Sequence, residues 1–425
     1  MTDAEAVRIL RLAAGGDGVG KLADGRTVFI PRTAPGDLVE IARMRSHRRF
    51  ARARIGQLLE SGPDRVAARC PHYDGDECGG CQLQHVAAER QLEIKRAVVG
   101  DALRRIAGLD VPDPEIVPSD IDWGYRNKLS LTVVAQGRRI GLHRFERPDE
   151  VFDLARCDIT DPALLELWRA VRAHRSLLPS NAERLVLRID RGGTRHLIVH
   201  TSDASAWASP SSLARELMRA GSPAVLWWHP DGGAARTVAG EAEAYPATVF
   251  EQVHPGFGDL IRAFAIDQLG SVEDRHVWDL YAGIGDTTDD LLRRGASVES
   301  VELDRRAVEF ADRRWRTRHG LPIASQAPDH GRVTRHAGRV EDLVEELRAP
   351  AQVISNPPRT GMDERVTEAI LAQSPSQLVY ISCDPATLAR DIARLAPAYR
   401  LGLVRAFDLF PQTAHVETVA VLEVA

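Results

Sequence analysis

Long apolar runs, cysteine and lysine are all scarce in this sequence of 425 residues. No stretch approaches the roughly 18 uninterrupted apolar residues of a membrane span, so no membrane partner is expected. The first ten residues carry Asp3 and Glu5 where a secretory signal has basic charge, which predicts a cytoplasmic protein. Five cysteines are too few for a disulfide framework. An odd number in a reducing compartment instead indicates metal ligation or a reactive thiol.

The composition that is present belongs to a folded globular protein. Hydrophobic residues make up 44% of the chain and charged residues 27%, which excludes disordered and fibrous classes. Because one domain usually holds about 100 to 200 residues, two or three domains are expected.

Basic charge is unevenly distributed along the chain. Lysine occurs only at positions 21, 95 and 128, so 52 of the 55 basic residues are arginine and arginine identity alone carries little information. Residues 1–69 hold thirteen basic and eight acidic residues although the whole chain has a net charge of −5. Six arginines lie between Ala42 and Gly56 with no acidic residue among them: Arg43, Arg45, Arg48, Arg49, Arg52 and Arg54. They form either a solvated charged edge or a nucleic-acid contact surface.

Three patterns predict a multidomain α/β protein. Residues 1–65 contain short alternating strands at 27–31, 34–41 and 53–59, separated by Gly, Pro and Asp, which are typical of a small OB-like β-barrel with the arginines on a rim loop. This stretch resembles the TRAM domain, an RNA-binding barrel. Residues 66–244 mix predicted helices at 85–108 and 162–174 with strands at 128–134 and 184–189, which indicates a central α+β domain. Residues 245–425 alternate apolar strands with helices, which predicts a Rossmann-like domain with a mainly parallel sheet.

A glycine-containing turn in the third domain is typical of a nucleotide-type site. A strand at 276–281 leads into Gly283 and Gly285 and then into a helix, and a second strand ends at Glu302, which can accept hydrogen bonds from ribose hydroxyls. Thr288 stands where a dinucleotide fingerprint has its third glycine, and no P-loop lysine follows. A ligand without pyrophosphate therefore fits better, and S-adenosylmethionine is the candidate. A purely structural turn is the alternative.

Two further strands of this domain end in polar residues. The strand at 352–355 runs into Asn356, and the strand at 377–382 runs into Cys383. Asp384 can cap the following helix with Pro385 at its first position, so the Cys383 thiol is expected at a helix N-terminus, where the dipole favours thiolate. A buried, inert cysteine is the alternative.

The other four cysteines form a group with one distant member: Cys70, Cys78, Cys81 and Cys157. Four thiolates can hold either tetrahedral zinc or a cubane iron-sulfur cluster, and the spacing does not choose between them.

Together these segments resemble the RNA uracil-5-methyltransferases, in particular the branch that has a TRAM domain and a [4Fe-4S] cluster and modifies 23S ribosomal RNA. The resemblance covers nearly the whole chain. It rests on Cys78-Gly79-Gly80-Cys81-Gln82, Tyr125-Arg126-Asn127-Lys128, Phe250-Glu251-Gln252-Val253, Asp279-Leu280-Tyr281-Ala282-Gly283-Ile284-Gly285, Ile381-Ser382-Cys383-Asp384-Pro385, and Phe410-Pro411-Gln412-Thr413 with His415-Val416-Glu417.

The resemblance implies a role for each matched residue. Cys383 would be the nucleophile and Glu417 the base. S-adenosylmethionine would be bound by residues around the glycine turn and the strand ends: Gln252, Tyr281, Gly283, Gly285, Asp286, Glu302 and Asn356. The cluster ligands would be Cys70, Cys78, Cys81 and Cys157. The RNA contacts would be Arg43, Arg45, Arg48, Arg49, Arg52, Arg126 and Lys128.

Three positions depart from the pattern of this family. Asn356 stands where aspartate is usual, Asp286 follows Gly285 where an asparagine or apolar residue is common, and Arg339 occupies the approximate place of an acidic or amide residue. These departures motivate a second hypothesis, an iron-sulfur RNA-binding protein of the same fold with impaired methyl transfer. A transfer RNA methyltransferase is a third.

Overall fold

The computed structural model describes residues 5–134, 139–241, 248–320 and 332–425. By their internal contacts these residues fall into two compact units. Unit 1 comprises residues 1–98, 120–242 and 410–415, and unit 2 comprises 99–119, 243–409 and 416–425. The predicted three-domain boundaries at 65 and 244 stay a prediction. Within the described ranges, no helix has the length and apolar character needed to cross a membrane.

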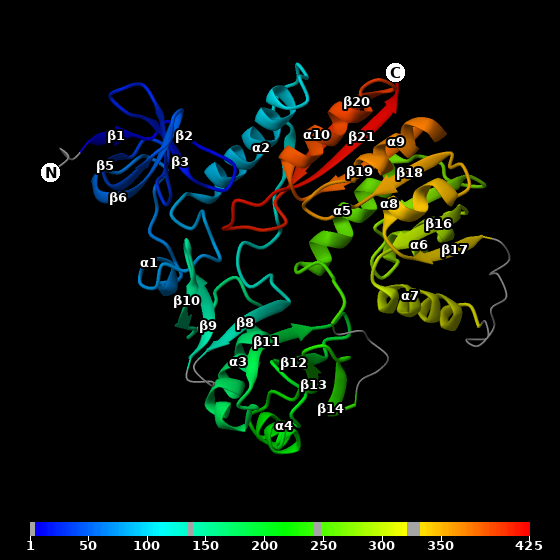
Figure 1. Ribbon diagram of the computed structural model, residues 1–425, viewed down its shortest axis with the longest axis horizontal. Coiled ribbons are helices and arrows are strands. Elements are labelled where there is room, and N and C mark those ends of the chain that lie inside the picture. The colour runs from blue at the N-terminus through cyan, green and yellow to red at the C-terminus, as the bar shows by residue number, and fades with distance from the viewer. Residues whose placement is uncertain (1–4, 135–138, 242–247, 321–331) are drawn as a thin grey trace. The chain divides into compact units, whose positions relative to one another are not determined.

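The N-terminal part of unit 1 is a six-stranded sheet with the order β1-β5-β6-β4-β3-β2 (Figure 1). Its strands are β1 (Ala6–Arg8), β2 (Arg11–Leu12), β3 (Gly18–Lys21), β4 (Thr27–Ile30), β5 (Leu38–Ser46) and β6 (Phe50–Glu60). The outermost strands, β1 and β2, are only two residues apart in the chain, so the sheet curls round on itself as a small barrel does. Its buried core includes Val7, Val28, Ile30 and Val39.

The cysteine-containing segment follows the barrel. A short helix α1 (Pro71–Asp74) begins directly after Cys70, and α2 (Ala88–Arg105) follows Cys81. Helix α2 is shorter at both ends than the predicted 85–108, and its last turns, from Val99 onward, pack with unit 2.

The central part of unit 1 is a seven-stranded sheet with the order β10-β9-β8-β11-β12-β13-β14. Its elements are β8 (Lys128–Val134), β9 (Arg139–Arg144), β10 (Arg147–Asp153), α3 (Pro162–Ala173), η1 (Arg175–Leu177), β11 (Ala182–Ile189), β12 (Arg195–Thr201), α4 (Pro210–Arg219), β13 (Val225–Pro230) and β14 (Arg236–Ala239). Leu129, Leu131, Leu185 and Leu187 point to one face, which α3 and α4 cover. The predicted strands at 128–134 and 184–189 and the helix at 162–174 are confirmed in this part.

Unit 2 is built on an eight-stranded sheet with the order β17-β16-β15-β18-β19-β21-β20-β7. Its strands are β7 (Glu115–Val117), β15 (His276–Leu280), β16 (Ser297–Glu302), β17 (Val333–Ala337), β18 (Gln352–Ser355), β19 (Gln377–Ser382), β20 (Tyr399–Phe407) and β21 (Glu417–Val424). Every strand is parallel to its neighbours except β21, which runs antiparallel between β19 and β20. The predicted mainly parallel sheet is therefore confirmed.

Helices cover this sheet and connect its strands (Figure 1). They are α5 (Pro255–Gln268), α6 (Asp286–Arg293), α7 (Arg305–Arg318), α8 (Val340–Leu343), η2 (Val344–Glu346), α9 (Glu364–Gln373) and α10 (Pro385–Leu395). The main core contains Trp278, Leu280, Val353 and Tyr380 of the strands together with side chains of α2, α8, α9 and α10. The alternate strand residues point to the other side, where α5 contacts β19 and β21.

Candidate active site

Cys383 and Glu417 are brought together by the register of two antiparallel strands. Ser382, the last residue of β19, is opposite Thr418 of β21. Cys383 follows Ser382 and Glu417 precedes Thr418, so the same register places these two residues opposite each other at the carboxyl edge of the parallel strands. The predicted placement of Glu417 at the start of the final strand is confirmed.

The environment of the two side chains differs from that of ordinary surface groups. Glu417 is buried, with 3% of its surface exposed, and burial raises the pKa of its carboxyl to about 8. Cys383 is half-buried. Burial, followed by the charge of Glu417, raises the pKa of the Cys383 thiol to about 11. Arg359 acts in the opposite direction on both groups, because its positive charge favours thiolate and carboxylate.

One expectation about Cys383 therefore needs correction. Asp384 does cap α10, accepting hydrogen bonds from the backbone N–H of Ala386 (3.0 Å) and Thr387 (2.9 Å), with Pro385 in the first turn. However, the pKa of the thiol is raised rather than lowered, because burial and the carboxylate of Glu417 outweigh the favourable charges. The positive charge of Arg359 opposes this rise in pKa. Sequence reasoning did not assign Arg359 a role, although it directly follows Asn356-Pro357-Pro358 at the end of a predicted strand.

The glycine turn lies between β15 and α6. Tyr281, Gly283 and Gly285 all have positive φ, at 63°, 57° and 78°. A Cβ on Gly285 would come within 2.9 Å of Ala311, whereas no heavy atom lies within 4 Å of the Cβ position on Gly283. Gly283 therefore leaves an open backbone surface at the end of β15, where a ligand can approach.

Glu302 organises the same edge. Its carboxylate accepts hydrogen bonds from the backbone N–H of Gly283 (2.8 Å) and of Asp304 (2.8 Å). Below the turn, Thr288 donates a hydrogen bond to the buried carboxyl of Asp279, and burial raises the pKa of Asp279 to about 7. The hydroxyl of Thr288 thus has a structural use at the place where a dinucleotide-binding turn has glycine.

Three other sequence candidates lie at or near this edge. Asp286 is the first residue of α6 and pairs with Arg314 at 2.8 Å and Arg262 at 3.6 Å. Asn356 follows β18, has an exposed side chain and donates its backbone N–H to Leu280 (3.1 Å). Gln252 is half-buried, and its Cβ lies 3.1 Å from the Cβ position on Gly258 in α5.

Arg339, the third departure from the family pattern, directs its guanidinium to Glu341 at 2.6 Å, and its side chain is exposed. The carboxylate of Glu341, two residues later, therefore compensates the charge of Arg339.

The four remaining cysteines are gathered within unit 1. Burial raises the pKa of Cys81 to about 12, and the neighbouring Cys157, Cys78 and Cys70 add to this shift. The pKa of Cys78 is likewise raised to about 11 by burial, with contributions from Cys157 and Cys70. In the described parts of the chain, no group of three or more His, Cys, Asp or Glu residues has the arrangement to hold a metal ion.

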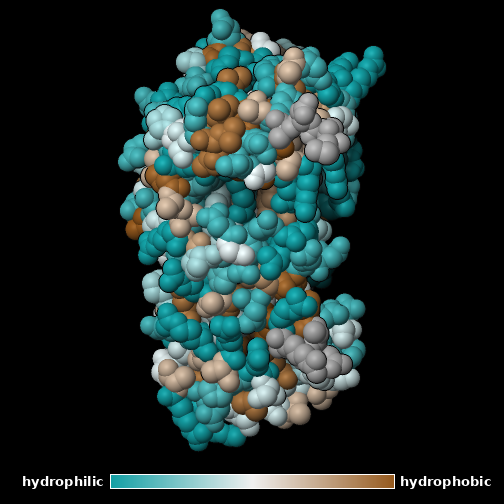
Figure 2. Space-filling model, turned by 90° about the vertical axis from the view of Figure 1, so that its left-hand side faces the viewer, coloured by the Kyte–Doolittle hydropathy of each residue, from teal (hydrophilic) through white to brown (hydrophobic). Residues whose placement is uncertain are grey.

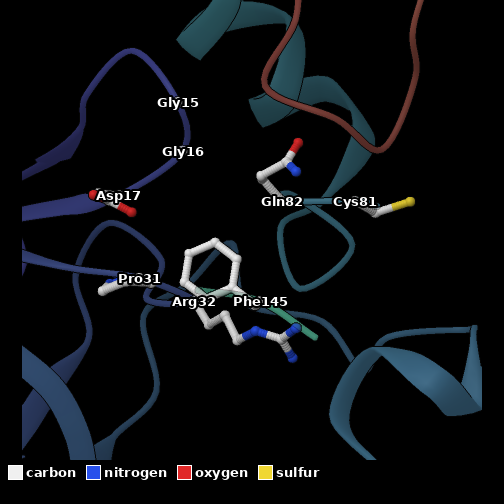
Figure 3. A pocket seen from close by; sticks show the side chains of 8 residues that line it. All are labelled: Gly15, Gly16, Asp17, Pro31, Arg32, Cys81, Gln82 and Phe145. Carbon is white, nitrogen blue, oxygen red and sulfur yellow. The ribbon is translucent and has the colours of Figure 1, made fainter. Parts of the chain in front are cut away.

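Arg32 of the barrel supports the cysteine segment. It donates a hydrogen bond to the carbonyl oxygen of Cys78 (2.9 Å) and another to that of Tyr73, and its guanidinium lies 4.3 Å from the centroid of the Tyr73 ring. Figure 3 shows Arg32 beside Phe145 in the small pocket that Cys81 and Gln82 also line.

The predicted rim loop of arginines is instead mostly strand. Arg43 and Arg45 lie in β5 and Arg52 in β6, so the cluster forms the β5–β6 hairpin, with only Arg48 and Arg49 in its turn. The register slips between Ala42 and Arg45, where Arg43 has a φ of 49°. Four guanidinium groups have no ion pair or hydrogen bond to any described residue: Arg43, Arg45, Arg48 and Arg49.

Hydrophilic side chains cover most of the face drawn in Figure 2, and hydrophobic ones gather in separate patches between them.

A basic face of the central sheet contains the predicted RNA contact Lys128 together with residues that sequence reasoning did not assign. Lys128 is opposite Arg188 on β11, and Arg184 is opposite His200 on β12, which in turn is beside His229 on β13. These residues point away from the face that α3 and α4 cover. Burial lowers the pKa of His200 to about 4, with Arg184, His229 and Lys128 contributing. The sequence contained a signal for this face. From Arg184 to Arg188 the basic residues alternate with Leu185 and Leu187, so the basic and apolar side chains point to opposite faces of the strand.

Comparisons with known proteins agree with this architecture. The TRAM domain family matches residues 5–55, and the tRNA (uracil-5-)-methyltransferase family matches residues 259–425. An uncharacterized RNA methyltransferase of Corynebacterium efficiens is 33% identical over 99% of this chain and 94% of its own length. A second, from Gloeobacter violaceus, is 31% identical over 98% of this chain and 96% of its own length.

A solved structure shares the fold over nearly the whole chain. It is the tRNA (uracil-54, C5)-methyltransferase of Pyrococcus abyssi in complex with S-adenosyl-L-homocysteine. The TM-score is 0.73 at 22% sequence identity, and the match covers 98% of this chain and all of that one.

Proposed function

Because the chain belongs to the RNA (uracil-5-)-methyltransferase family, we propose that it uses S-adenosylmethionine to methylate C5 of a uridine in RNA, with Cys383 as nucleophile and Glu417 as base. One observation carries these two roles. A half-buried thiol and a buried carboxyl are opposed across the β19–β21 register at the carboxyl edge of the sheet, the edge at which α/β proteins bind ligands.

Cys383 makes the pyrimidine reactive. Uracil C5 is too weak a nucleophile to accept a methyl group unaided. The thiolate adds to C6, which pushes electron density onto C5 and the O4 oxygen and gives an enolate whose C5 can attack. S-adenosylmethionine, when bound, supplies the electrophilic methyl group. Arg359 stabilises the thiolate by its charge before the addition.

Glu417 completes the reaction. After methyl transfer C5 carries both the methyl group and its original proton. The Glu417 carboxylate takes that proton, the electron pair of the C5–H bond forms the C5–C6 double bond, and the Sγ–C6 bond breaks so that the thiolate leaves. A pKa near neutrality suits a group that must accept a proton and release it in each cycle.

The residues of the glycine turn fit the methyl donor. Gly283 leaves its backbone open, and Glu302 is the last residue of β16, at the position that accepts hydrogen bonds from a ribose. We assign the donor site to these residues together with Gln252, Tyr281, Gly285, Asp286 and Asn356. The amide of Asn356 both donates and accepts hydrogen bonds, so the departure from aspartate is compatible with binding.

RNA binding is assigned to the β5–β6 hairpin and to the basic face of the central sheet. The hairpin arginines at 43, 45, 48 and 49 have no competing acidic partner among the described residues, whereas Arg52 and Arg54 are paired with Asp17 and Glu146. Arg126, Lys128 and Arg184 add positive charge on the second surface. The target uridine has to leave its stack to reach Cys383.

We further propose that Cys70, Cys78, Cys81 and Cys157 hold a [4Fe-4S] cluster. The support is that the four thiols lie close enough to raise one another's pKa, although the described side chains are not arranged as a metal site. Zinc is the alternative for the same donor set. Iron and zinc content and a visible absorption spectrum of protein purified without oxygen distinguish the two.

We propose 23S ribosomal RNA as the substrate. The support is the resemblance of the cysteine group and the TRAM-like barrel to the iron-sulfur branch of the family. Mass-spectrometric mapping of 5-methyluridine in RNA from cells with and without the protein tests this, and loss of the mark from transfer RNA alone would overturn it.

The reaction itself is tested with RNA that contains 5-fluorouridine. Fluorine at C5 cannot be removed as a proton, so we expect the enzyme and S-adenosylmethionine to give a denaturation-resistant protein–RNA adduct that Cys383→Ala abolishes. RNA binding without any adduct would instead support the impaired, purely RNA-binding alternative.

A further inference from the structure

The six residues from Phe410 to His415, shortly before the base, belong to a different unit from the base itself. By their contacts these residues group with unit 1, whereas β20 before them and β21 after them group with unit 2. We call them the 410–415 segment. Glu417 is separated from this segment by Val416 alone, so the segment leads directly into the start of β21.

The cysteine-containing part of the chain binds the backbone of the 410–415 segment. The N–H of Leu83 donates to the carbonyl of Gln412 (3.0 Å), and the N–H of Ala414 donates to the side-chain oxygen of Gln82 (3.2 Å). Figure 3 shows the side chains of Gln82 and Cys81 pointing in different directions from adjacent positions. Gln82 can therefore hold the segment whatever Cys81 binds.

Helix α2 binds the same segment with two buried side chains. Gln91 makes a reciprocal pair with Gln412, accepting from its backbone N–H and donating to its side-chain oxygen, both at 3.1 Å. Lys95 donates from Nζ to the carbonyl oxygen of Phe410 (3.0 Å). Only 1% of Lys95 is exposed. A buried ammonium is costly unless it is bound, so this lysine is a strong anchor for the carbonyl that it contacts.

A third anchor comes from the segment just before β8. The hydroxyl of Tyr125 donates to the carbonyl of Pro411 (3.0 Å), and Tyr125 is itself buried. The carbonyl oxygens of Phe410, Pro411 and Gln412 are therefore bound by three different parts of the chain.

The segment needs such anchors because its backbone is strained. Gln412 has a φ of 69°, in the left-handed region that residues other than glycine rarely adopt. Strained residues of this kind persist only where the surroundings determine them, and they concentrate at functional sites. The loop ends one residue before Glu417, whose strand is held on its two sides by pairing with β19 and β20.

We propose that Gln91, Lys95 and Tyr125 are positioning residues for Glu417. They hold the 410–415 segment and thereby act on the last step of the reaction. The inference rests on the proposed function of Glu417. The step concerned is transfer of the C5 proton to Glu417, with the C5–H electron pair forming the C5–C6 double bond and the Sγ–C6 pair leaving with sulfur. Addition of Cys383 and methyl transfer precede this step and do not use the carboxylate as a base.

The test is a single-turnover reaction with Tyr125→Phe, Lys95→Met and Gln91→Leu. Enzyme is mixed with methyl-labelled S-adenosylmethionine and total RNA from cells that lack the protein, then quenched in denaturant at intervals. Labelled protein–RNA adduct and labelled free RNA are separated on a denaturing gel. We expect adduct to form at the wild-type rate and to resolve roughly 10- to 100-fold more slowly, since a misplaced base loses part of its contribution. Glu417→Gln is the reference for full loss of this step.

Glu93→Gln is the matched control, because Glu93 is exposed on the same helix and pairs with Arg90. It should resolve the adduct as wild type does. Tyr125→Phe removes a single oxygen and is the variant expected to keep its melting temperature. Folded variants that resolve adduct at the wild-type rate, or that slow formation and resolution together, would overturn the proposal, and so would unfolding of all three. Failure of the proposed function gives a different result, namely no labelled RNA and no adduct with the wild-type protein.

Discussion

At the scale of single residues, the site couples two groups that oppose each other's ionisation. A charged Glu417 raises the pKa of Cys383, and burial raises the pKa of both. A protonated Glu417 therefore favours the thiolate that starts the reaction, and an ionised Glu417 is needed to finish it. Arg359 favours both ionised forms and so offsets part of the effect of burial on each pKa.

The pH dependence of adduct resolution follows from this arrangement. Burial raises the pKa of Glu417 to about 8, so the carboxylate that accepts the proton is the minor form below that pH and the major form above it. In the single-turnover assay the resolution rate should rise with pH and level off above about 8. Cys383 is already bonded to C6 at this stage, so its own pKa does not enter. A profile that is already flat above about pH 6 would contradict the assignment, and Glu417→Gln should show a slow rate without this rise.

At the scale of elements, the β5–β6 hairpin differs from the rest of the charged surface. Many arginines in the described part of the chain are paired, as Arg314 is with Asp286 and Asp289. The hairpin arginines at 43, 45, 48 and 49 have no such partner within the described residues. Unpaired guanidinium groups on a twisted hairpin are ready to contact phosphates along an RNA backbone.

Replacing these four arginines by glutamine should weaken RNA binding and reduce its salt dependence. The slope of log Kd against log salt concentration should fall by roughly 0.7 for each phosphate of a single strand that the variant no longer neutralises. Fluorescence anisotropy with an unstructured RNA measures this. Arg215→Gln with Arg219→Gln, on the exposed side of α4, is the control and should leave the slope unchanged. If both variants changed the slope equally, the hairpin would have no specific role in RNA binding.

At the scale of the whole molecule, one chain passes between two units several times. Helix α2 begins in unit 1 and ends in unit 2, and the 410–415 segment returns to unit 1 shortly before the final strand. The cysteine group lies in unit 1 and the Cys383–Glu417 pair in unit 2. The cysteines proposed to bind a cluster and the cysteine proposed to react are thus in separate parts of the molecule.

This separation predicts different consequences for two cysteine substitutions. Cys78→Ala should lose iron and lower the melting temperature, because a cluster contributes folding energy. Cys383→Ala should keep its iron and its melting temperature but form no adduct with 5-fluorouridine RNA. Metal analysis, thermal unfolding and the adduct gel measure the three properties. An equal loss of stability in both variants would contradict the division.

Much of the architecture was determined by the sequence itself. Alternating and continuous apolar runs predicted β8, β15, β18 and β19 nearly to the residue, because strand periodicity depends only on local order. The same holds for the cap of α10, since Asp384 and Pro385 act on the residues next to them. The grouping of Cys383 with Glu417 came from the family resemblance, not from spacing.

Only the tertiary structure decided how these pieces affect one another. The raised pKa of Cys383 depends on the burial of its own thiol and on the charge of Glu417, 34 positions away in sequence. The anchoring of Gln412 depends on Gln91 and Leu83, more than 300 positions earlier. The basic face of the central sheet likewise exists only once β8, β11, β12 and β13 are paired in register. Burial and charge interactions depend on distance in space, which local sequence does not specify until the strands are paired.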